Sequence, residues 1–174
     1  MLTTTTYDSP VGELTVTVSP VGVRALLWPA EAWDGRQVFI GASPDDEVHV
    51  ERSSVPSLEH PLLAETLRQL DEYFAGTRRQ FDLPLDPVGT PFQLRTWKLL
   101  STIPYGQTLS YGEQARRLGD DRLARAVGAA NGRNPISIIV PCHRVVGANG
   151  SLVGFGGGLD AKRWLLTHES DTLF

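Results

Sequence analysis

The hydrophobic pattern of the chain changes at residues 77–90, which contain two prolines and a glycine and continue no regular period from either side. Apolar residues alternate in the first third of the chain, as in β-strands, and recur at helical spacing in the second half. A chain of 174 residues can bury enough surface for two small domains. We therefore predict an N-terminal domain at residues 1–80, a linker at 81–90 and a C-terminal domain at 91–174.

The N-terminal domain is predicted to begin as a small β-sheet. Within residues 13–18 every second side chain is apolar, as in a half-buried strand. A Ser-Pro-Val-Gly turn at 19–22 leads into residues 23–28, which we expect to pair antiparallel with the first strand. Further short apolar stretches follow within residues 34–56.

One helix follows the predicted sheet. Pro61 suits a first helical turn, and Gly76 supplies a stop. Between them, apolar residues recur at steps of four, three and four, which places them on one helical face: Leu63, Leu67, Leu70 and Phe74.

The C-terminal domain is predicted to consist mainly of short helices. Thr90 and Ser110 each open a capping-box pattern, so a helix should begin after each of them. Another helix is expected at residues 122–131, and the tight turn at 118–121 would join it to the preceding helix as a helix-turn-helix. The pattern alone does not establish DNA binding, because many such helix pairs never touch DNA.

The segment that leads to the sole cysteine is predicted to be a strand. Residues 136–140 are apolar, mostly β-branched and too few for a stable helix, so we expect a buried strand that ends at Cys142. The Asn-Gly pair at 149–150 predicts a hairpin whose second strand is 151–153. Helical spacing returns at residues 159–169.

A single cysteine excludes an internal disulfide and any zinc site made of several cysteines. Cys142 stands beside His143 and Arg144, and positive neighbours stabilise a thiolate, which is the nucleophilic form. Successive side chains on an extended strand point to opposite faces, however, so adjacency alone does not bring His143 to the thiol. From these residues alone, a packed, unreactive cysteine explains the sequence as well as a nucleophile does.

The net charge of −4 is unevenly distributed along the chain. Residues 1–89 hold 6 Lys and Arg against 14 Asp and Glu, whereas residues 90–174 hold 10 against 6. Unless this asymmetry is chance, a polyanion would dock on the second half. No segment reaches the roughly 20 apolar residues of a membrane span, and the N-terminus lacks a signal-peptide pattern, so we expect a cytoplasmic protein.

The second half carries a continuous series of motifs from about Thr90 to Glu169. They are Ile103-Pro104-Tyr105-Gly106-Gln107-Thr108, Ala124-Arg125-Ala126-Val127-Gly128, Ala130-Asn131-Gly132-Arg133-Asn134-Pro135 and Pro141-Cys142-His143-Arg144-Val145. In this order they resemble the motifs of the O6-alkylguanine-DNA alkyltransferases. In residues 1–89 the resemblance is looser and rests on Ser9-Pro10-Val11-Gly12 and on the helix that ends at Phe74.

The resemblance implies an α/β plus α fold. The N-terminal domain would be a ribonuclease H-like sheet and helix, and the C-terminal domain would be helical, with a helix-turn-helix and an active-site strand. It also implies direct-reversal DNA repair: double-stranded DNA is bound through the minor groove and the damaged guanine is flipped out of the stack. The O6-alkyl group would then move irreversibly to Cys142, so the protein would act as a methyltransferase that is consumed in one turnover.

The resemblance further implies how the transfer is activated. Glu169 would orient His143, and His143 would activate the Cys142 thiol through water. Tyr111 would supply a proton or a hydrogen bond to the departing guanine. Without the resemblance, Tyr111 reads as a core aromatic and Glu169 as a solvated helix end.

Four further positions are implied to contact DNA or to brace the site. Arg125 would enter the duplex in place of the flipped base, and Asn134 would brace the turn between the recognition helix and the active-site strand. Main-chain groups near Val145 and Gly156 would contact the flipped base. Gly156 stands where some members have serine, and Phe155 where some have tyrosine, which leaves the range of accepted alkyl groups open.

No cofactor is expected, and no metal, because zinc-binding members use several cysteines and histidines in the N-terminal domain. Neither a membrane nor an obligate protein partner is expected, whereas cooperative assembly on DNA and activity on O4-alkylthymine stay open. The protein would be associated with the nucleoid of a prokaryote or lie in the nucleus of a eukaryote. Three alternatives fit less well: a lesion sensor would lack the thiol, a fused transcription regulator would need a longer chain, and a nucleotide-binding loop at 154–158 would need glycine at Leu159.

Overall fold

The computed structural model describes residues 1–29, 48–50 and 60–170. The chain divides into two units, Met1–Val88 and Gly89–Phe174. Most of the apolar stretches expected within residues 34–56 lie outside the described residues. Among the described residues, no helix has the length and apolar character needed to cross a membrane.

The N-terminal unit contains a four-stranded sheet in the order β3-β2-β1-β4. The strand predicted at residues 13–18 is confirmed, and its apolar residues Leu14 and Val16 are fully buried. The strand is more than half-buried, however, because Thr17 on its other face is fully buried as well. The predicted antiparallel pairing of residues 23–28 is also confirmed, with Thr15 opposite Leu27. The strands are β1 (Leu2–Ser9), β2 (Gly12–Val18), β3 (Val23–Leu27) and β4 (Val48–Val50), of which β4 alone runs parallel to its neighbour, β1.

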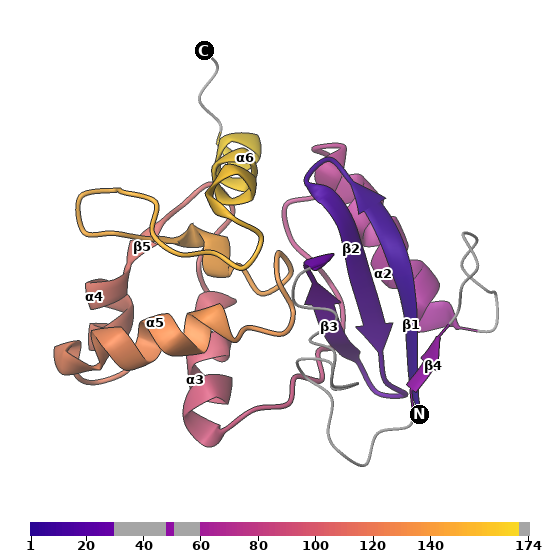
Figure 1. Ribbon diagram of the computed structural model, residues 1–174, viewed down its shortest axis with the longest axis horizontal. Helices are drawn as coiled ribbons and strands as arrows, with labels where there is room; N and C mark the ends of the chain where they lie inside the picture. The colour runs from indigo at the N-terminus through magenta and orange to yellow at the C-terminus, as the bar shows by residue number, and fades with distance from the viewer. Residues whose placement is uncertain (30–47, 51–59, 171–174) are drawn as a thin grey trace. The chain divides into compact units, whose positions relative to one another are not determined.

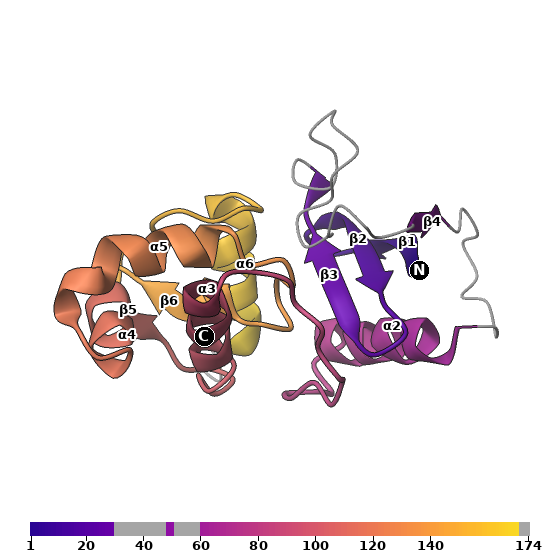
Figure 2. The same ribbon diagram turned by 90° about the horizontal axis from the view of Figure 1, so that it is seen from below.

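Helix α2 (Pro61–Phe74) packs along one face of this sheet (Figure 2). The predicted apolar face is confirmed in part: Leu63 and Leu70 are fully buried, whereas Leu67 and Phe74 are only half-buried. The other buried residues of the helix are Thr66, Gln69 and Tyr73. The helix ends before Gly76, whose φ of 80° is a left-handed conformation that glycine adopts without strain.

Part of the predicted linker packs within the N-terminal unit. Val23 exchanges two backbone hydrogen bonds of 2.8 Å with residues 84–86. The Asp86 carboxylate accepts hydrogen bonds from Ser19 Oγ at 2.6 Å and from Arg24 Nη2 at 2.7 Å. Residues 84–86 are therefore held beside β3 by backbone and side-chain bonds.

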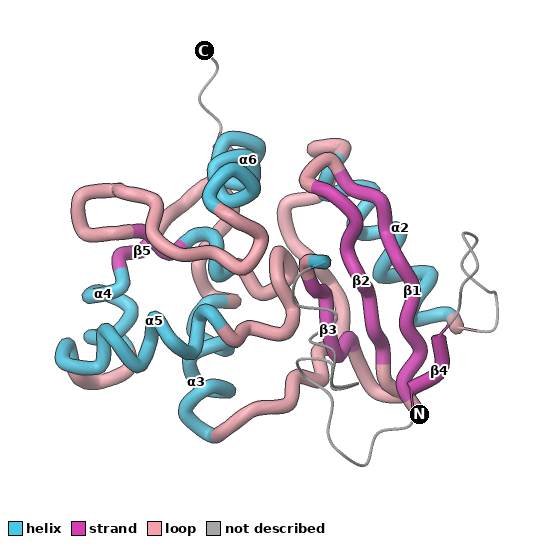
Figure 3. The backbone as a smooth tube through the Cα atoms, in the orientation of Figure 1, coloured by secondary structure: helices cyan, strands magenta, loops and turns pink. Residues whose placement is uncertain are grey.

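The described part of the C-terminal unit consists of short helices, long loops and one pair of short parallel strands (Figures 1 and 3). Its elements are α3 (Pro91–Leu100), β5 (Leu109–Ser110), α4 (Tyr111–Arg117), the 3₁₀ helix η1 (Asp121–Leu123), α5 (Ala124–Gly132), the 3₁₀ helix η2 (Cys142–Arg144), β6 (Val145–Val146) and α6 (Leu159–Glu169).

The predicted helix starts are confirmed. Thr90 and Gln93 form the complete capping box at the start of α3. Ser110 accepts a hydrogen bond from the backbone N–H of Glu113 at the start of α4, but the Glu113 carboxylate pairs with two arginines of its own helix instead of closing the box. The final predicted helix, residues 159–169, is confirmed as α6.

The two helices expected to form the helix-turn-helix pack against each other. Gly119, with φ of 109°, lies in the turn after α4, and η1 leads into α5. The end of α5 is tied to α3, because Trp97 Nε1 donates a hydrogen bond of 2.8 Å to the carbonyl oxygen of Ala130.

The strand predicted at residues 136–140 is wrong, although its burial is confirmed. These residues form successive turns, with hydrogen bonds from Ile139 N to Ser137 O and from Val140 N to Ile136 O. Ile138 has φ of 72°, which is rare for a β-branched residue and persists only where the surroundings enforce it. Asn134 enforces it by bridging the segment: its Nδ2 donates to Val140 O at 2.8 Å and its Oδ1 accepts from Ile136 N at 3.0 Å.

The predicted hairpin around 149–150 is wrong as well. A turn is present, because Gly150 N donates to Gly147 O and Gly147 N donates to Ser151 O, both at 2.8 Å. Residues 151–153 nevertheless form no strand, and β6 pairs with β5 in parallel. The two residues of β6 find their partner elsewhere, so the Asn-Gly signal sets the turn but not the strand pairing.

We expect Asn134→Ala to lower the free energy of unfolding by about 1–3 kcal/mol, because it leaves the buried Ile136 N–H without a partner and removes one of the two donors to Val140 O, the other being Cys142 N. Urea denaturation measures this change. Asn149→Ala is the matched control, since that side chain accepts one exposed hydrogen bond in a turn, and its effect should stay within about 0.5 kcal/mol. Equal effects for the two variants would contradict the bracing role of Asn134.

Candidate active site

Cys142 begins the 3₁₀ helix η2 and is buried together with the two residues that follow it. The exposed fractions of Cys142, His143 and Arg144 are 9%, 0% and 7%. Because the segment is wound into a turn, the alternation expected of an extended strand does not apply here. Sequence neighbours on η2 therefore share one buried environment.

The carboxylate of Glu169, the last residue of α6, binds both side chains that follow the cysteine. Glu169 Oε1 lies 2.7 Å from His143 Nε2. Arg144 donates to the same carboxylate from Nε at 2.8 Å and from Nη2 at 2.9 Å. Arg144 also donates to Ile103 O at 2.6 Å, so its charge serves the carboxylate, whereas the sequence suggested that it would serve the thiol.

These contacts determine the protonation of the site. Burial raises the pKa of Glu169, but hydrogen bonds from His143 and Arg144 outweigh it and bring the pKa to about 2. Burial lowers the pKa of His143, and the bond to Glu169 offsets this only in part. The imidazole is thus neutral at pH 7 and carries its proton on Nε2, because that nitrogen faces an ionised carboxylate.

The other imidazole nitrogen is left as an acceptor. His143 Nδ1 is buried and makes no hydrogen bond with any described residue. A buried acceptor of this kind is costly unless a proton donor reaches it, directly or through water. A neutral histidine fixed by a carboxylate, with its second nitrogen available beside a cysteine, is suited to accept a thiol proton.

Tyr111 is the first residue of α4, and its ring lies half-buried near the thiol. Its hydroxyl donates a hydrogen bond of 3.0 Å to the carbonyl oxygen of Val153. Burial and the negative charge of Cys142 raise the pKa of Tyr111. The phenol therefore keeps its proton at neutral pH and is available as a donor.

Lys162 belongs to the same site and was missed in the sequence. Its side chain is fully buried, and Nζ donates to Val145 O at 2.6 Å and to Val153 O at 3.1 Å. Burial lowers the pKa of Lys162, whereas the negative charge of Cys142 raises it. The helical spacing of the sequence could have identified it. Lys162, Leu165 and Glu169 lie on one face of α6, and a lysine on a buried face needs hydrogen-bond partners.

The remaining predicted residues are more widely spread. Asn134 braces the loop that leads to Cys142, and Val145 is buried, with its carbonyl oxygen bound by Lys162. Arg125 is exposed near the start of α5 and forms no ion pair with any described residue. Gly156 lies in the loop between β6 and α6, and no hydrogen bond among the described residues joins it to the site.

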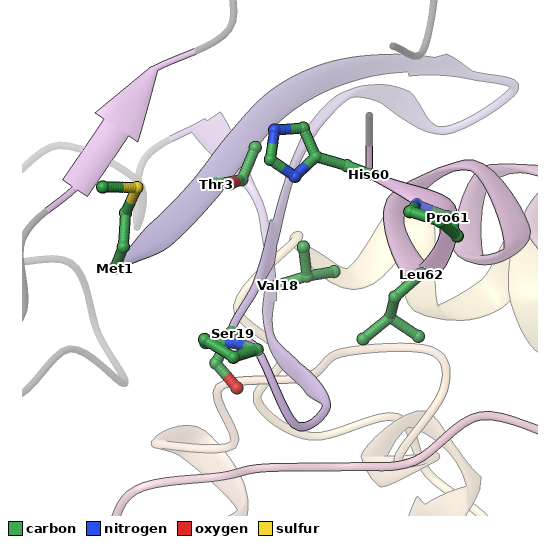
Figure 4. Close-up of a pocket in the computed structure, with 8 residues that line it drawn as sticks. Met1, Thr3, Val18, Ser19, His60, Pro61 and Leu62 are labelled. Carbon is green, nitrogen blue, oxygen red and sulfur yellow. The ribbon is translucent and has the colours of Figure 1, made fainter. Parts of the chain in front are cut away.

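No other described feature offers comparable chemistry. A cavity of about 290 Å³ in the N-terminal unit lies beside Val18, Ser19 and His60 (Figure 4). Of the two hydroxyl residues that line it, Thr3 and Ser19, the latter already binds Asp86 through Oγ. Among the described residues there is also no cluster of His, Cys, Asp and Glu that could hold a metal ion.

The chain is similar to known proteins in both of its units. Residues 91–171 match the DNA-binding domain of 6-O-methylguanine DNA methyltransferase, and residues 2–87 match its ribonuclease-like domain. A methylated-DNA–protein-cysteine methyltransferase of Mycolicibacterium paratuberculosis is 46% identical over 94% of this chain and 90% of its own length. A protein of the same name from Mycobacterium leprae is 58% identical over 64% of this chain and 67% of its own.

Solved structures give the same result. Mycobacterium tuberculosis OGT in complex with DNA is 42% identical, covers 96% of this chain and 92% of its own, and has a TM-score of 0.80. The O6-methylguanine-DNA methyltransferase of Pyrococcus kodakaraensis is 25% identical, covers 97% and 99%, and has a TM-score of 0.61. The matches span both units, so the chain belongs to the 6-O-methylguanine DNA methyltransferase family.

Proposed function

We propose that the protein repairs DNA by moving the alkyl group of O6-alkylguanine onto its own Cys142. The observation that carries this proposal is the buried array in which Glu169 binds His143 and His143 is adjacent to the sole cysteine. The relatives named methylated-DNA–protein-cysteine methyltransferase, and the related structure in complex with DNA, support it.

The chemistry is a direct displacement at the alkyl carbon. The thiol proton of Cys142 passes to His143 Nδ1 through water, and the ionised Glu169 stabilises the imidazolium that forms. The thiolate then attacks the alkyl carbon, a carbon–sulfur bond forms, and the carbon–oxygen bond breaks with its electron pair left on guanine O6. The thioether has no route back to a thiol, so each molecule acts once.

Tyr111 would assist the departure of guanine. The leaving base gains negative charge as the bond breaks, and the Tyr111 phenol, which keeps its proton because its pKa is raised, can donate a hydrogen bond to that charge. Its present partner, Val153 O, is also held by Lys162. Val153 O therefore keeps a donor when the Tyr111 hydroxyl turns to the base.

The DNA contacts would come from the helix-turn-helix. A stacked base cannot reach a buried thiol, so the guanine must be extruded. Arg125 is exposed and not engaged in a described ion pair, so it is suited to fill the space left in the duplex. Entry through the minor groove, contacts of Val145 and Gly156 with the base, and action on nucleoid or nuclear DNA belong to the same proposal.

Transfer should be visible as a change in protein mass. We expect the protein to gain one methyl group when incubated with a short duplex that contains O6-methylguanine, and the group should map to Cys142. Intact-protein and peptide mass spectrometry measure both. Cys142→Ser should gain nothing while still binding the duplex. If wild type bound the lesion without any gain in mass, a lesion sensor would replace the repair proposal.

The pH dependence of transfer tests His143 as the base. Because the His143 pKa lies below its usual 6.5, the wild-type rate should stay flat as the pH falls through 6.5 and should decrease only at lower pH. His143→Gln should be about a hundredfold slower at pH 7. Its rate should then rise towards about pH 8.5, where a free thiol ionises by itself. Parallel wild-type and variant profiles would argue against proton transfer to His143.

Glu169→Gln should lower the free energy of unfolding by about 3 kcal/mol at pH 7, because the amide leaves Arg144 buried without a counter-charge. In wild type, the contribution of Glu169 is complete above its unfolded pKa of about 4.3 and is lost as the pH falls towards 2. Urea denaturation across this range measures both effects.

The matched control is Glu113→Gln, which also loses contacts to two arginines but at an exposed position. Its effect should be much smaller than that of Glu169→Gln, because solvent screens exposed ion pairs. If Glu169→Gln were no more harmful than this control, the carboxylate would not be the link between η2 and α6 that the contacts describe.

A further inference from the structure

The two helices of the helix-turn-helix are joined by a reciprocal pair of side-chain hydrogen bonds. Gln114 Nε2 donates to Asn131 Oδ1 at 2.9 Å, and Asn131 Nδ2 donates to Gln114 Oε1 at 2.8 Å. The exposed fractions of the two residues are 0% and 8%. Each amide is both donor and acceptor to the other, so neither can move without leaving buried polar groups unpaired.

This amide pair lies one helical turn from Tyr111. Gln114 follows Tyr111 by three residues in α4, and Asn131 follows Gly128 by three residues in α5, so each helix presents both residues on one side. The Tyr111 ring is directed at Gly128, where an added Cβ would lie 4.0 Å from Tyr111 Cε1. The two contacts are therefore successive levels of one helix–helix interface.

Apolar side chains would hold the helices together without fixing their alignment. Contacts between aliphatic groups have no direction, so they specify the alignment of two helices less strictly than paired hydrogen bonds do. Two amides bonded reciprocally allow one alignment only, and buried polar pairs are best attested as devices that fix the register of helices. Gln114 and Asn131 therefore do more than pack the two helices together: their hydrogen bonds fix how α4 and α5 are aligned.

We propose that Gln114 and Asn131 are positioning residues that fix Tyr111 relative to Arg125, near the start of α5. This inference rests on the proposed function, in which α5 brings Arg125 into the duplex while α4 presents Tyr111 to the extruded base. Transfer from duplex DNA needs both groups in place at once. Transfer from a free base needs Tyr111 but not Arg125, so the two substrates separate alignment from chemistry.

The test compares full-length wild type with the double variant Gln114→Leu and Asn131→Leu, which removes both amides together and leaves neither unpaired. Intact-protein mass gives the rate of methyl transfer from an O6-methylguanine duplex and from free O6-methylguanine at millimolar concentration. We expect the wild-type melting temperature and free-base rate. The duplex rate should fall roughly tenfold to a hundredfold, as small misplacements of reacting groups do.

A swapped pair, Gln114→Asn with Asn131→Gln, should restore the duplex rate, because it keeps both amides and the same total side-chain length. If the leucine pair prevents folding, Gln114→Met alone is compared by the same ratio of duplex to free-base rates. An unchanged ratio, whether both rates hold or both fall together, overturns the positioning role. Failure of wild type to transfer from either substrate instead overturns the proposed function.

Discussion

The site depends on one buried carboxylate that is shared by two donors. Glu169 ends α6 and binds both His143 and Arg144 on η2, and Arg144 continues to the carbonyl oxygen of Ile103 after α3. A buried charge is costly unless it is paired and hydrogen-bonded. Separating these three segments would therefore leave an unpaired charge in the protein interior. The same pairing keeps Glu169 ionised and sets the tautomer of His143. Stability of the C-terminal unit and readiness of the thiol therefore come from the same contacts.

Local signals in the sequence predicted most of the helical framework, because they act within a few residues. Thr90 caps α3 through its own side chain, and the spacing of apolar residues after Pro61 identifies the buried side of α2. Lys162 could have been predicted in the same way, since it lies on the same face of the helix as Glu169. The pairing of Glu169 with His143 is different in kind: 26 residues separate them, and only the resemblance to a family linked the two.

The strand expected before Cys142 shows where local reasoning ends. Apolar, β-branched residues favour strands mainly because they pack well beside a neighbouring strand, and residues 136–140 have burial without such a ladder. The deciding residue is Asn134, whose single amide satisfies a donor and an acceptor across the segment. The spacing of apolar residues in a sequence cannot reveal such a hydrogen-bonded bridge. The result matters for chemistry, because the wound segment places Cys142 and His143 in one turn.

The charges around the thiol also differ before and after transfer. In the reactive state the negative charge of Cys142 raises the pKa of Lys162, while burial lowers it. A thioether carries no charge, so transfer removes the negative charge that favours the ammonium of Lys162, while the burial that disfavours it stays. Lys162 donates to Val145 O in β6 and to Val153 O in the loop that follows. Val153 O also accepts the hydrogen bond of the Tyr111 hydroxyl. The thiolate therefore favours the ammonium form of Lys162, the form that has the most protons to donate to these two carbonyl oxygens.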